Sequence, residues 1–269
     1  MRTGANPSLA AGAAIVGLIA AAAAIGPLVG HGDPFAIDLA RSLAPPSRAH
    51  WLGCDALGRD ELSRIIFGAR LSLGVSVSVV ALSLTIGSLI GGSAALAGGR
   101  IDDLVMRAVD IVLAFPGFLL AIALAAILGP GIVDLVAALT AMGWTGYARL
   151  VRGQILSLRE REYVEAARSL GASPGRLLLR HLMPALAGPL AVQATFGIGG
   201  IIVAEAALSF LGLGVLPPTP SWGNMLDAGR AFMLVSPHLT TAPGAAIGVT
   251  VLGFNLLGDG LAGAVASRD

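Results

Sequence analysis

Two acidic residues of this sequence stand inside long apolar stretches, where an ionisable side chain is costly and is therefore often functional. Asp110 follows Arg107 by three residues, so we predict an ion pair between them on one helix face. Glu205 has no basic residue near it in the sequence. Its carboxylate could meet a cationic ligand or, alternatively, take a hydrogen-bonded packing role. These two groups are the first candidates for chemistry in the chain.

Other kinds of chemistry are excluded by composition. The chain contains no Lys, so it holds neither the lysine of a Walker A motif nor a Schiff base to Lys. The single Cys54 excludes a disulfide within the chain. No Ser, His and carboxylate arrangement indicates a nucleophilic site. The four histidines lack the spacing of metal ligands, and they are His31, His50, His181 and His238.

A short charged stretch over residues 161–172 interrupts the apolar segments and has helical periodicity. Tyr163, Ala166, Ala167 and Leu170 fall at i, i+3, i+4 and i+7, which places them on one face. The charged residues of the stretch lie elsewhere on the helix, and the two alanines allow close approach from outside. We therefore interpret this stretch as a docking element and not as a membrane span.

The residues after this stretch predict a turn and a second helix. Gly171 can take the left-handed conformation that ends the first helix. Ser173 can cap the next helix, Pro174 suits its first turn, and Pro184 limits it. Its apolar side is formed by Leu177, Leu178 and Leu182. The sequence thus predicts a helix, a tight turn and a helix over about residues 157–184.

The composition is that of an integral membrane protein. Hydrophobic residues make up 55% of the 269 positions and charged residues only 12%, and the mean hydropathy is +0.83, outside the range of soluble domains. A helix that crosses a bilayer needs about 20 mostly apolar residues. We therefore predict an all-α fold with six transmembrane helices and interpret the first one as a retained anchor and not a cleaved signal peptide. The six segments are 9–30, 71–98, 104–128, 132–150, 185–213 and 240–262.

The distribution of Arg predicts the orientation, because positive charges are enriched on the cytoplasmic side. With both termini inside, eleven Arg residues lie in the cytoplasm and six lie outside. The inner set is Arg2, Arg100, Arg107, Arg149, Arg152, Arg159, Arg161, Arg168, Arg176, Arg180 and Arg268. The outer set is Arg41, Arg48, Arg59, Arg64, Arg70 and Arg230. The charged stretch at 161–172 is therefore expected on the cytoplasmic side.

Two longer connections are expected outside. Residues 31–70 read as an ordered external loop, and its last part, 61–70, reads as an amphipathic segment at the interface before the second span. We accordingly divide the chain into residues 1–70, an anchor helix with an external segment, and residues 71–269, a core of five helices. The second connection, 214–238, is rich in Pro and places Trp222 at the membrane interface.

Several separated motifs resemble one family. They are His50-Trp51-Leu52-Gly53 with Gly58-Arg59-Asp60, the Glu-Ala-Ala-x3-Gly pattern from Glu165, residues 208–214 with 217–223, and residues 254–259. With them the chain resembles the permease subunits of bacterial ABC importers of the dipeptide, oligopeptide and nickel group, specifically the C-type partner of the permease pair. The resemblance covers nearly all residues after 33.

This resemblance implies the type I permease fold of such importers and a set of partners. They are a second homologous permease, two cytoplasmic ATPase subunits and an extracytoplasmic solute-binding protein, assembled in the lipid of the bacterial inner membrane. The resemblance implies no nucleic acid and no cofactor in this chain, since ATP and Mg would be bound by the ATPases. It also implies that the loop at 157–184 is the coupling helix region. The residues expected to contact the ATPase are Tyr163, Glu165, Ala166, Ala167, Arg168 and Gly171.

Two further sites follow from the resemblance. Glu205 is expected to face the translocation path or the second permease, where it could meet the amino terminus of a peptide. The external segment after residue 210 is expected to form part of the outer gate or the contact with the binding protein, or else to be simply a stiff loop. Its candidate residues are Gly212, Gly214, Pro217, Pro218 and Trp222.

The expected function is therefore that of a permease subunit for di- or oligopeptide uptake, which changes nothing chemically in its substrate. A nickel or metal-chelate importer is the alternative within the family. A secondary transporter would need coupling carboxylates at mid-membrane, for which Glu205 is the one candidate. An intramembrane enzyme would need a nucleophile with its base on adjacent spans. A requirement for separate ATPase subunits discriminates among these classes.

Overall fold

The computed structural model describes residues 7–29 and 33–266, and within these ranges the chain is helical. The only β pairing in these ranges is an isolated bridge between Cys54 and Asp60. Arg2, His31 and Arg268, which the sequence analysis used, lie outside the described residues. The all-α prediction is confirmed.

Four helices of the described residues are long and apolar enough to cross a membrane. They are α1 (Pro7–Val29), of which residues 7–26 qualify, α2 (Glu61–Ala97), α9 (Ala187–Phe210) and α11 (His238–Ala266). They correspond to the predicted first, second, fifth and sixth spans.

The predicted third span is two helices, and the expectation of one unbroken helix over 104–128 is wrong. α3 (Gly99–Ala114) and α4 (Gly117–Leu128) meet at a bend of 86°. The bend lies at Pro116, which lacks a backbone N–H and disfavours helical geometry in the residue before it. Phe115 is accordingly extended, with φ −81° and ψ 140°. If the bent pair is one span, the described residues hold up to five candidate spans.

The predicted fourth span, 132–150, lies within α5 (Ile132–Leu158), a helix of 27 residues. α5 is not among the described helices that qualify as spans by composition alone. Charged residues such as Asp134 and Arg149 lower its hydropathy. The total of six spans therefore stays a prediction.

The first external connection ends earlier than expected, because α2 already begins at Glu61. The Asp60 side chain caps this helix by accepting a hydrogen bond from the Ser63 backbone N–H at 2.8 Å. From there α2 runs through 37 residues without a break. Residues 61–70 are thus the first turns of α2 and not a separate interfacial segment, and the division of the chain after residue 70 falls inside this helix.

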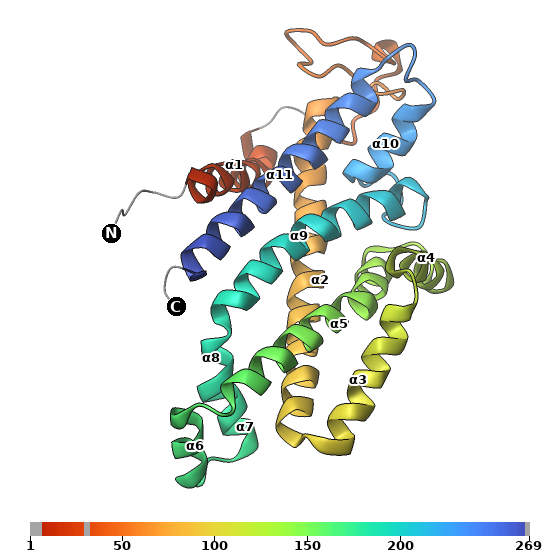
Figure 1. Ribbon diagram of the computed structural model, residues 1–269. Helices are drawn as coiled ribbons and strands as arrows, with labels where there is room; N and C mark the ends of the chain where they lie inside the picture. The colour runs from red at the N-terminus through yellow and green to blue at the C-terminus, as the bar shows by residue number, and fades with distance from the viewer. Residues whose placement is uncertain (1–6, 30–32, 267–269) are drawn as a thin grey trace.

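α2 runs through the middle of the molecule, and α5 and α9 cross it (Figure 1). Small residues allow these crossings: a β-carbon on Gly87 or Gly91 of α2 would collide with the α5 backbone between Trp144 and Ala148. α1 packs on α11 in the same way, since side chains on Gly12 or Gly260 would collide with the facing helix. The glycine-rich spans thus serve close packing.

The connecting elements gather at two opposite ends of the molecule (Figure 1). One end, called here the loop end, consists of residues 33–60, with the 3-10 helix η1 (Leu39–Arg41), and of α10 (Trp222–Arg230). The other, called here the α6 end, consists of α6 (Glu162–Ser169) and α7 (Pro174–Arg176). A π-helix (Leu177–Leu182) and α8 (Met183–Ala185) lead from α7 to α9. The connections predicted on opposite sides of the membrane thus lie at opposite ends.

Candidate functional site

α6 is a short helix whose charges suit its ends. Glu162 and Glu165 lie in the first turn and Arg168 in the last, which complements the helix dipole. At the C-terminus the Ala172 N–H donates to the Ala167 carbonyl at 3.1 Å, and the Gly171 N–H donates to the Arg168 carbonyl at 2.9 Å. This pair of bonds is a Schellman motif, and it needs the left-handed residue that Gly171 supplies with φ +83°.

The next helix begins as the sequence predicts. The Ser173 hydroxyl accepts a hydrogen bond from the Arg176 N–H at 3.4 Å, and Pro174 occupies the first turn of α7. The three leucines expected on the apolar side, Leu177, Leu178 and Leu182, are all buried. Pro184 does not end this helix directly but lies in the first turn of the short α8, after which the chain turns at Leu186 and enters α9.

One side chain, Val164, anchors α6 to the rest of the chain. It is fully buried in an apolar cluster with Val151 and Ile155 of α5 and with Leu178 and Leu182 of the π-helix. The sequence analysis missed this residue because it counted only the alanine face. Its signal was present, since Val164 stands three residues before Ala167, which also packs against the cluster.

The predicted alanine face of α6 is mostly exposed. Tyr163 is 45% exposed and Leu170 is 89% exposed, although both are large and apolar in character. The four predicted residues lie together along one hollow of about 470 Å³. Its full lining is Tyr163, Ala166, Ala167, Leu170, Ala172, Arg176 and His181. An exposed apolar hollow of this kind can receive a side chain of another protein.

The two charged residues predicted for this site lie on the other side of α6. Glu165 and Arg168 are exposed and line a second hollow, of about 510 Å³, together with Arg159 and Glu160. The structure thus places an apolar hollow and a charged hollow on two sides of one short helix. Such an arrangement offers both packing and ion pairs to a partner, and it holds no group arranged for covalent chemistry among the described residues.

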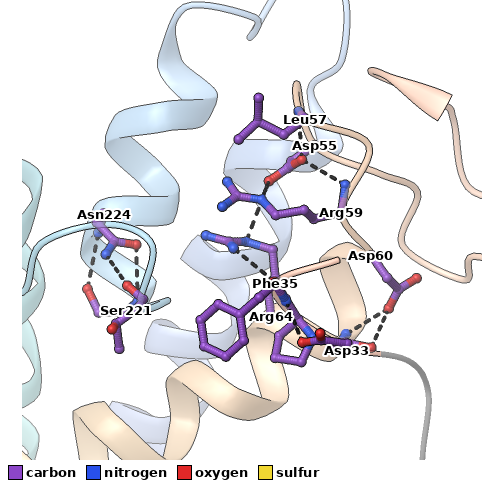
Figure 2. A network of polar contacts seen from close by, with 12 residues as sticks. Asp33, Phe35, Asp55, Leu57, Arg59, Asp60, Arg64, Ser221 and Asn224 are labelled. Carbon is purple, nitrogen blue, oxygen red and sulfur yellow. Dashed lines mark hydrogen bonds and ion pairs between the residues drawn. The ribbon is translucent and has the colours of Figure 1, made fainter. Parts of the chain in front are cut away.

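The loop end is held by a network of ion pairs around Asp55, which Figure 2 shows. One Asp55 oxygen accepts from the backbone N–H groups of Leu57 and Arg59, at 2.8 and 2.9 Å. The other accepts from Arg59 Nε at 2.7 Å and lies 3.6 Å from Arg64 Nε. Because the side chains of Arg59 and Arg64 are only 11% and 5% exposed, Asp55 is a shared counter-ion for two nearly buried cations.

A second set of contacts around Asp60 joins this loop to α2. Asp60 pairs with His50 Nδ1 at 2.9 Å, and His50 Nε2 lies 2.9 Å from Arg41. Cys54 lies beneath the loop with no exposed surface, and burial together with Asp60 raises the pKa of its thiol. The external loop predicted from the sequence is therefore ordered by its own charges.

A pocket of about 500 Å³ separates this loop from α10 and the start of α11. Apolar side chains such as Phe35, Met225 and Phe232 line most of it, and Pro217 and Pro218 border it. Glu61 also lines it; this side chain is 2% exposed, and its Oε1 has no hydrogen-bond partner within the described residues. The sequence analysis did not single out Glu61.

The comparisons with known proteins identify the family. Residues 83–268 match the family described as binding-protein-dependent transport system inner membrane component. The chain belongs to this family. It is thus an integral inner-membrane permease subunit of an ABC importer, with the type I permease fold.

Curated relatives agree with this assignment. The permease is 48% identical over 216 residues to the glutathione transport system permease protein GsiD of Shigella dysenteriae serotype 1, covering 80% of this chain and 71% of the relative. The same identity and coverage hold for GsiD of Escherichia coli O157:H7. GsiD of Pectobacterium atrosepticum is 46% identical over 216 residues, with 80% and 72% covered.

Glu205 of the permease does not lie where the sequence analysis expected. Its side chain is fully buried and accepts hydrogen bonds from Ser72 of α2 at 2.8 Å and from Ser209 of α9 at 2.9 Å. The Ser221 side chain, just before α10, lies beside this carboxylate as well. The expectation that Glu205 faces the path is corrected, because three hydroxyls from different segments enclose it. The alternative, a hydrogen-bonded packing role, describes it.

Asp110 also has a different partner from the predicted Arg107. It accepts a hydrogen bond from Arg149 of α5 at 2.6 Å. About two turns earlier in α3, Asp102 forms a double hydrogen bond with Arg152 at 2.6 and 2.7 Å. Both pairs join α3 to α5. The partner of each aspartate is therefore determined by the packing of these two helices and not by the spacing within α3.

The segment predicted as an outer gate divides into exposed and buried residues. Gly212, Pro217 and Pro218 are exposed, and Gly212 has φ +77°. Gly214 and Trp222 are buried, and the Trp222 indole N–H donates to the Ile65 carbonyl at 3.0 Å. The expected interfacial place of Trp222 is therefore wrong, because its ring packs beside Gly68 of α2. On either side of it in the sequence, Ser221 and Asn224 cap α10 reciprocally (Figure 2).

Proposed function

We propose that this permease forms, with a second homologous permease, the path for uptake of small peptides, and that α6 seats it on an ATPase subunit. ATP-driven closure of two ATPase subunits then moves α6 as a lever and switches the spans between inward-facing and outward-facing states. An extracytoplasmic binding protein delivers the solute at the loop end. Both termini and α6 are cytoplasmic in this arrangement.

The exposed face of α6 carries this proposal. A helix of eight residues is held to its own chain through Val164 and Ala167, while Tyr163, Ala166 and Leu170 stay open along the hollow. A large apolar side chain that is 89% exposed, as Leu170 is, is costly in water and is stabilised when a partner covers it. Glu165 and Arg168 add charges on the opposite flank.

The relatives support a peptide as the solute. They are permease proteins of glutathione transport systems, and glutathione is a tripeptide with an ammonium group and carboxylates. With 48% identity over 80% of this chain, a solute of similar size and charge is the best supported assignment. Selection among peptides then rests largely on the binding protein.

The decisive experiment tests coupling through Gly171. The complete importer is reconstituted in vesicles with its binding protein, and ATP hydrolysis and uptake of labelled glutathione are both measured. Gly171→Val should abolish uptake while hydrolysis continues, because a β-branched residue resists the left-handed conformation that orients α6. Gly175→Val is the matched control, since a β-carbon there meets open space and the backbone has no positive φ.

Normal uptake by the Gly171 variant would refute the role of α6. Uptake of glutathione by the permease without any ATPase subunit would instead support a secondary transporter. ATP hydrolysis coupled to the uptake of other peptides, and not of glutathione, is a third outcome. In that case the assignment as an ABC importer would stand, and only the assigned solute would change.

A further inference from the structure

The pocket between the loop of residues 33–60 and α10 contains a buried acid that the described chain leaves without a partner. Glu61 lines this pocket, is 2% exposed, and its Oε1 accepts no hydrogen bond within the described residues. A buried acceptor without a donor is costly, because it has lost its water and gained nothing in exchange. Native proteins leave few such groups, so this one requires an explanation.

The basic residue best placed to pair with Glu61 is occupied elsewhere. Arg64 follows it by three residues in α2, a spacing that allows an ion pair on one helix face. Its Nη1 instead donates to the Pro34 carbonyl at 3.2 Å, and its Nε lies 3.6 Å from Asp55 (Figure 2). The Glu61 backbone N–H donates to the Gly53 carbonyl at 3.0 Å. The residue is therefore held at the pocket wall, and its Oε1 is left without a donor among the described residues.

The walls of the pocket are mostly apolar and come from separate segments. Phe35 of the loop is fixed by Phe67 of α2, whose ring it meets edge to face with centroids 5.6 Å apart. Met225 of α10 is buried, and Phe232 and Leu239 line the pocket from the turn before α11 and from its start. Rings and the thioether of methionine make favourable contacts with an aromatic ligand.

Water alone does not suit a pocket with these walls. Its volume of about 500 Å³ lies within the range of ligand sites and would hold roughly 15 water molecules at about 30 Å³ each. A buried water needs about two to four polar partners. Of the four charged side chains in the lining, three already bind one another, namely Asp55, Arg59 and Arg64. Most of the water would therefore lie against apolar carbon, a cost that a ligand with an apolar body avoids.

The charge of the lining discriminates between classes of ligand. Two acids and two arginines line the pocket, so their formal charges sum to zero: Asp55, Glu61, Arg59 and Arg64. An ammonium ligand would bring an uncompensated positive charge into this apolar pocket, and a carboxylate ligand would bring a negative one. A hydroxyl group can donate to Glu61 and adds no charge. The lining therefore favours a neutral ligand.

We propose that this pocket binds a small neutral molecule with an aromatic body and one hydroxyl group, which donates a hydrogen bond to Glu61 Oε1. The bound molecule contacts the loop of residues 33–60, α2 and α10 at once and joins these segments. Because it binds only the folded loop end, it stabilises that end against local opening. The site lies at the end of the molecule opposite α6, so it is separate from the proposed coupling contact (Figure 1).

Three matched probes test the proposal. The assembled importer without its binding protein is titrated in lipid nanodiscs with benzyl alcohol, benzyl methyl ether and benzylamine. Ligand-observed NMR gives the dissociation constants after subtraction of binding to empty nanodiscs. Benzyl alcohol should bind at least about tenfold more tightly than the ether, which has no donor, and than the amine, which is cationic at neutral pH. Glu61→Met removes the acceptor at similar length and should weaken the binding of benzyl alcohol by a similar factor.

A second variant keeps the test valid if Glu61→Met folds poorly. Ala228 lines the pocket and is exposed on α10, so Ala228→Trp takes up pocket volume without entering the core. It should abolish the binding of benzyl alcohol. Ala231→Trp is the matched control, since Ala231 is also exposed but does not line the pocket. Benzyl alcohol should also slow hydrogen exchange over residues 33–60 severalfold in the native chain and in Ala231→Trp, but not in Ala228→Trp.

Equal affinities for the alcohol and the ether would overturn the hydrogen bond to Glu61, and tighter binding of benzylamine would overturn the neutral ligand. Binding no stronger than that of empty nanodiscs would overturn the site itself, and so would binding that Ala228→Trp leaves unchanged. These measurements involve neither uptake nor ATP hydrolysis. Their outcome is therefore independent of the solute and of the coupling through α6.

Discussion

The two ends of this permease differ in whether their side chains find partners within the chain. At the loop end, polar side chains find partners within the chain: Asp55 is the shared counter-ion of Arg59 and Arg64, and the buried Glu205 accepts hydrogen bonds from serine hydroxyls. At the α6 end, a helix attached mainly through Val164 leaves its apolar face open. The charges of the loop end thus find their partners within this chain, apart from Glu61, whereas the α6 end presents an apolar face that a second protein can cover.

This contrast predicts that substitutions at the two ends affect different properties, folding stability at one and assembly at the other. Substitutions at the loop end should cost folding free energy, because they leave buried polar groups without partners. Substitutions on the open face of α6 should cost little stability and should act on assembly. The four changes below are ordered by their expected effect on the free energy of unfolding.

Glu205→Ala should have the largest effect. It opens a cavity and leaves the hydroxyls of Ser72 and Ser209 without their acceptor, which should cost about 4 kcal/mol. The melting temperature of the solubilised protein measures this loss. Glu205→Gln keeps an acceptor and the volume, and it should cost only about 1 kcal/mol. An alanine variant that is stable but fails in uptake would indicate that Glu205 acts in the translocation path.

Asp55→Ala should follow at roughly 3 kcal/mol, because two nearly buried guanidinium groups lose their counter-ion. Thermal unfolding again measures the effect. Arg230→Ala serves as the control, since its ion pair with Asp227 is exposed and should be worth less than about 1 kcal/mol. Equal losses in the two variants would show that the loop network adds nothing beyond a surface pair.

Val164→Ala should cost about 2 kcal/mol, but mainly in the docking of α6. We expect faster hydrogen exchange over residues 162–169, while the melting temperature of the bundle changes less. Exchange that increases equally in α2 and α5 would contradict a local anchor and would indicate that α6 supports the whole core.

Leu170→Ala should change stability least, by less than about 0.5 kcal/mol, because the side chain is 89% exposed. It should nevertheless weaken co-purification of ATPase subunits in mild detergent. Leu179→Ala is the control, as Leu179 is 62% exposed and does not line the hollow of α6. Unchanged ATPase recovery with Leu170→Ala would argue that partners do not use this face.

The sequence predicted the local parts of this site well. Hydropathy located the apolar segments, and the spacing from Tyr163 to Leu170 predicted one face of α6. Gly171 and Ser173 predicted the turn, because a positive φ and a capping hydroxyl are properties of single residues and their immediate neighbours. The break at Pro116 could have been read in the same way, but the apolar run around it concealed it.

What the sequence could not predict depends on contacts between distant residues. Glu205 meets Ser72, 133 residues away, and Asp110 meets Arg149, 39 residues away and not the nearby Arg107. Whether Trp222 faces lipid or α2 likewise depends on how the helices pack. Sequence alone determined the class, the helical segments and the turn of the α6 end, since these follow from local propensity and hydropathy. Only the tertiary structure decided which charges are enclosed and which remain open, because burial is a property of the helices packed around a residue.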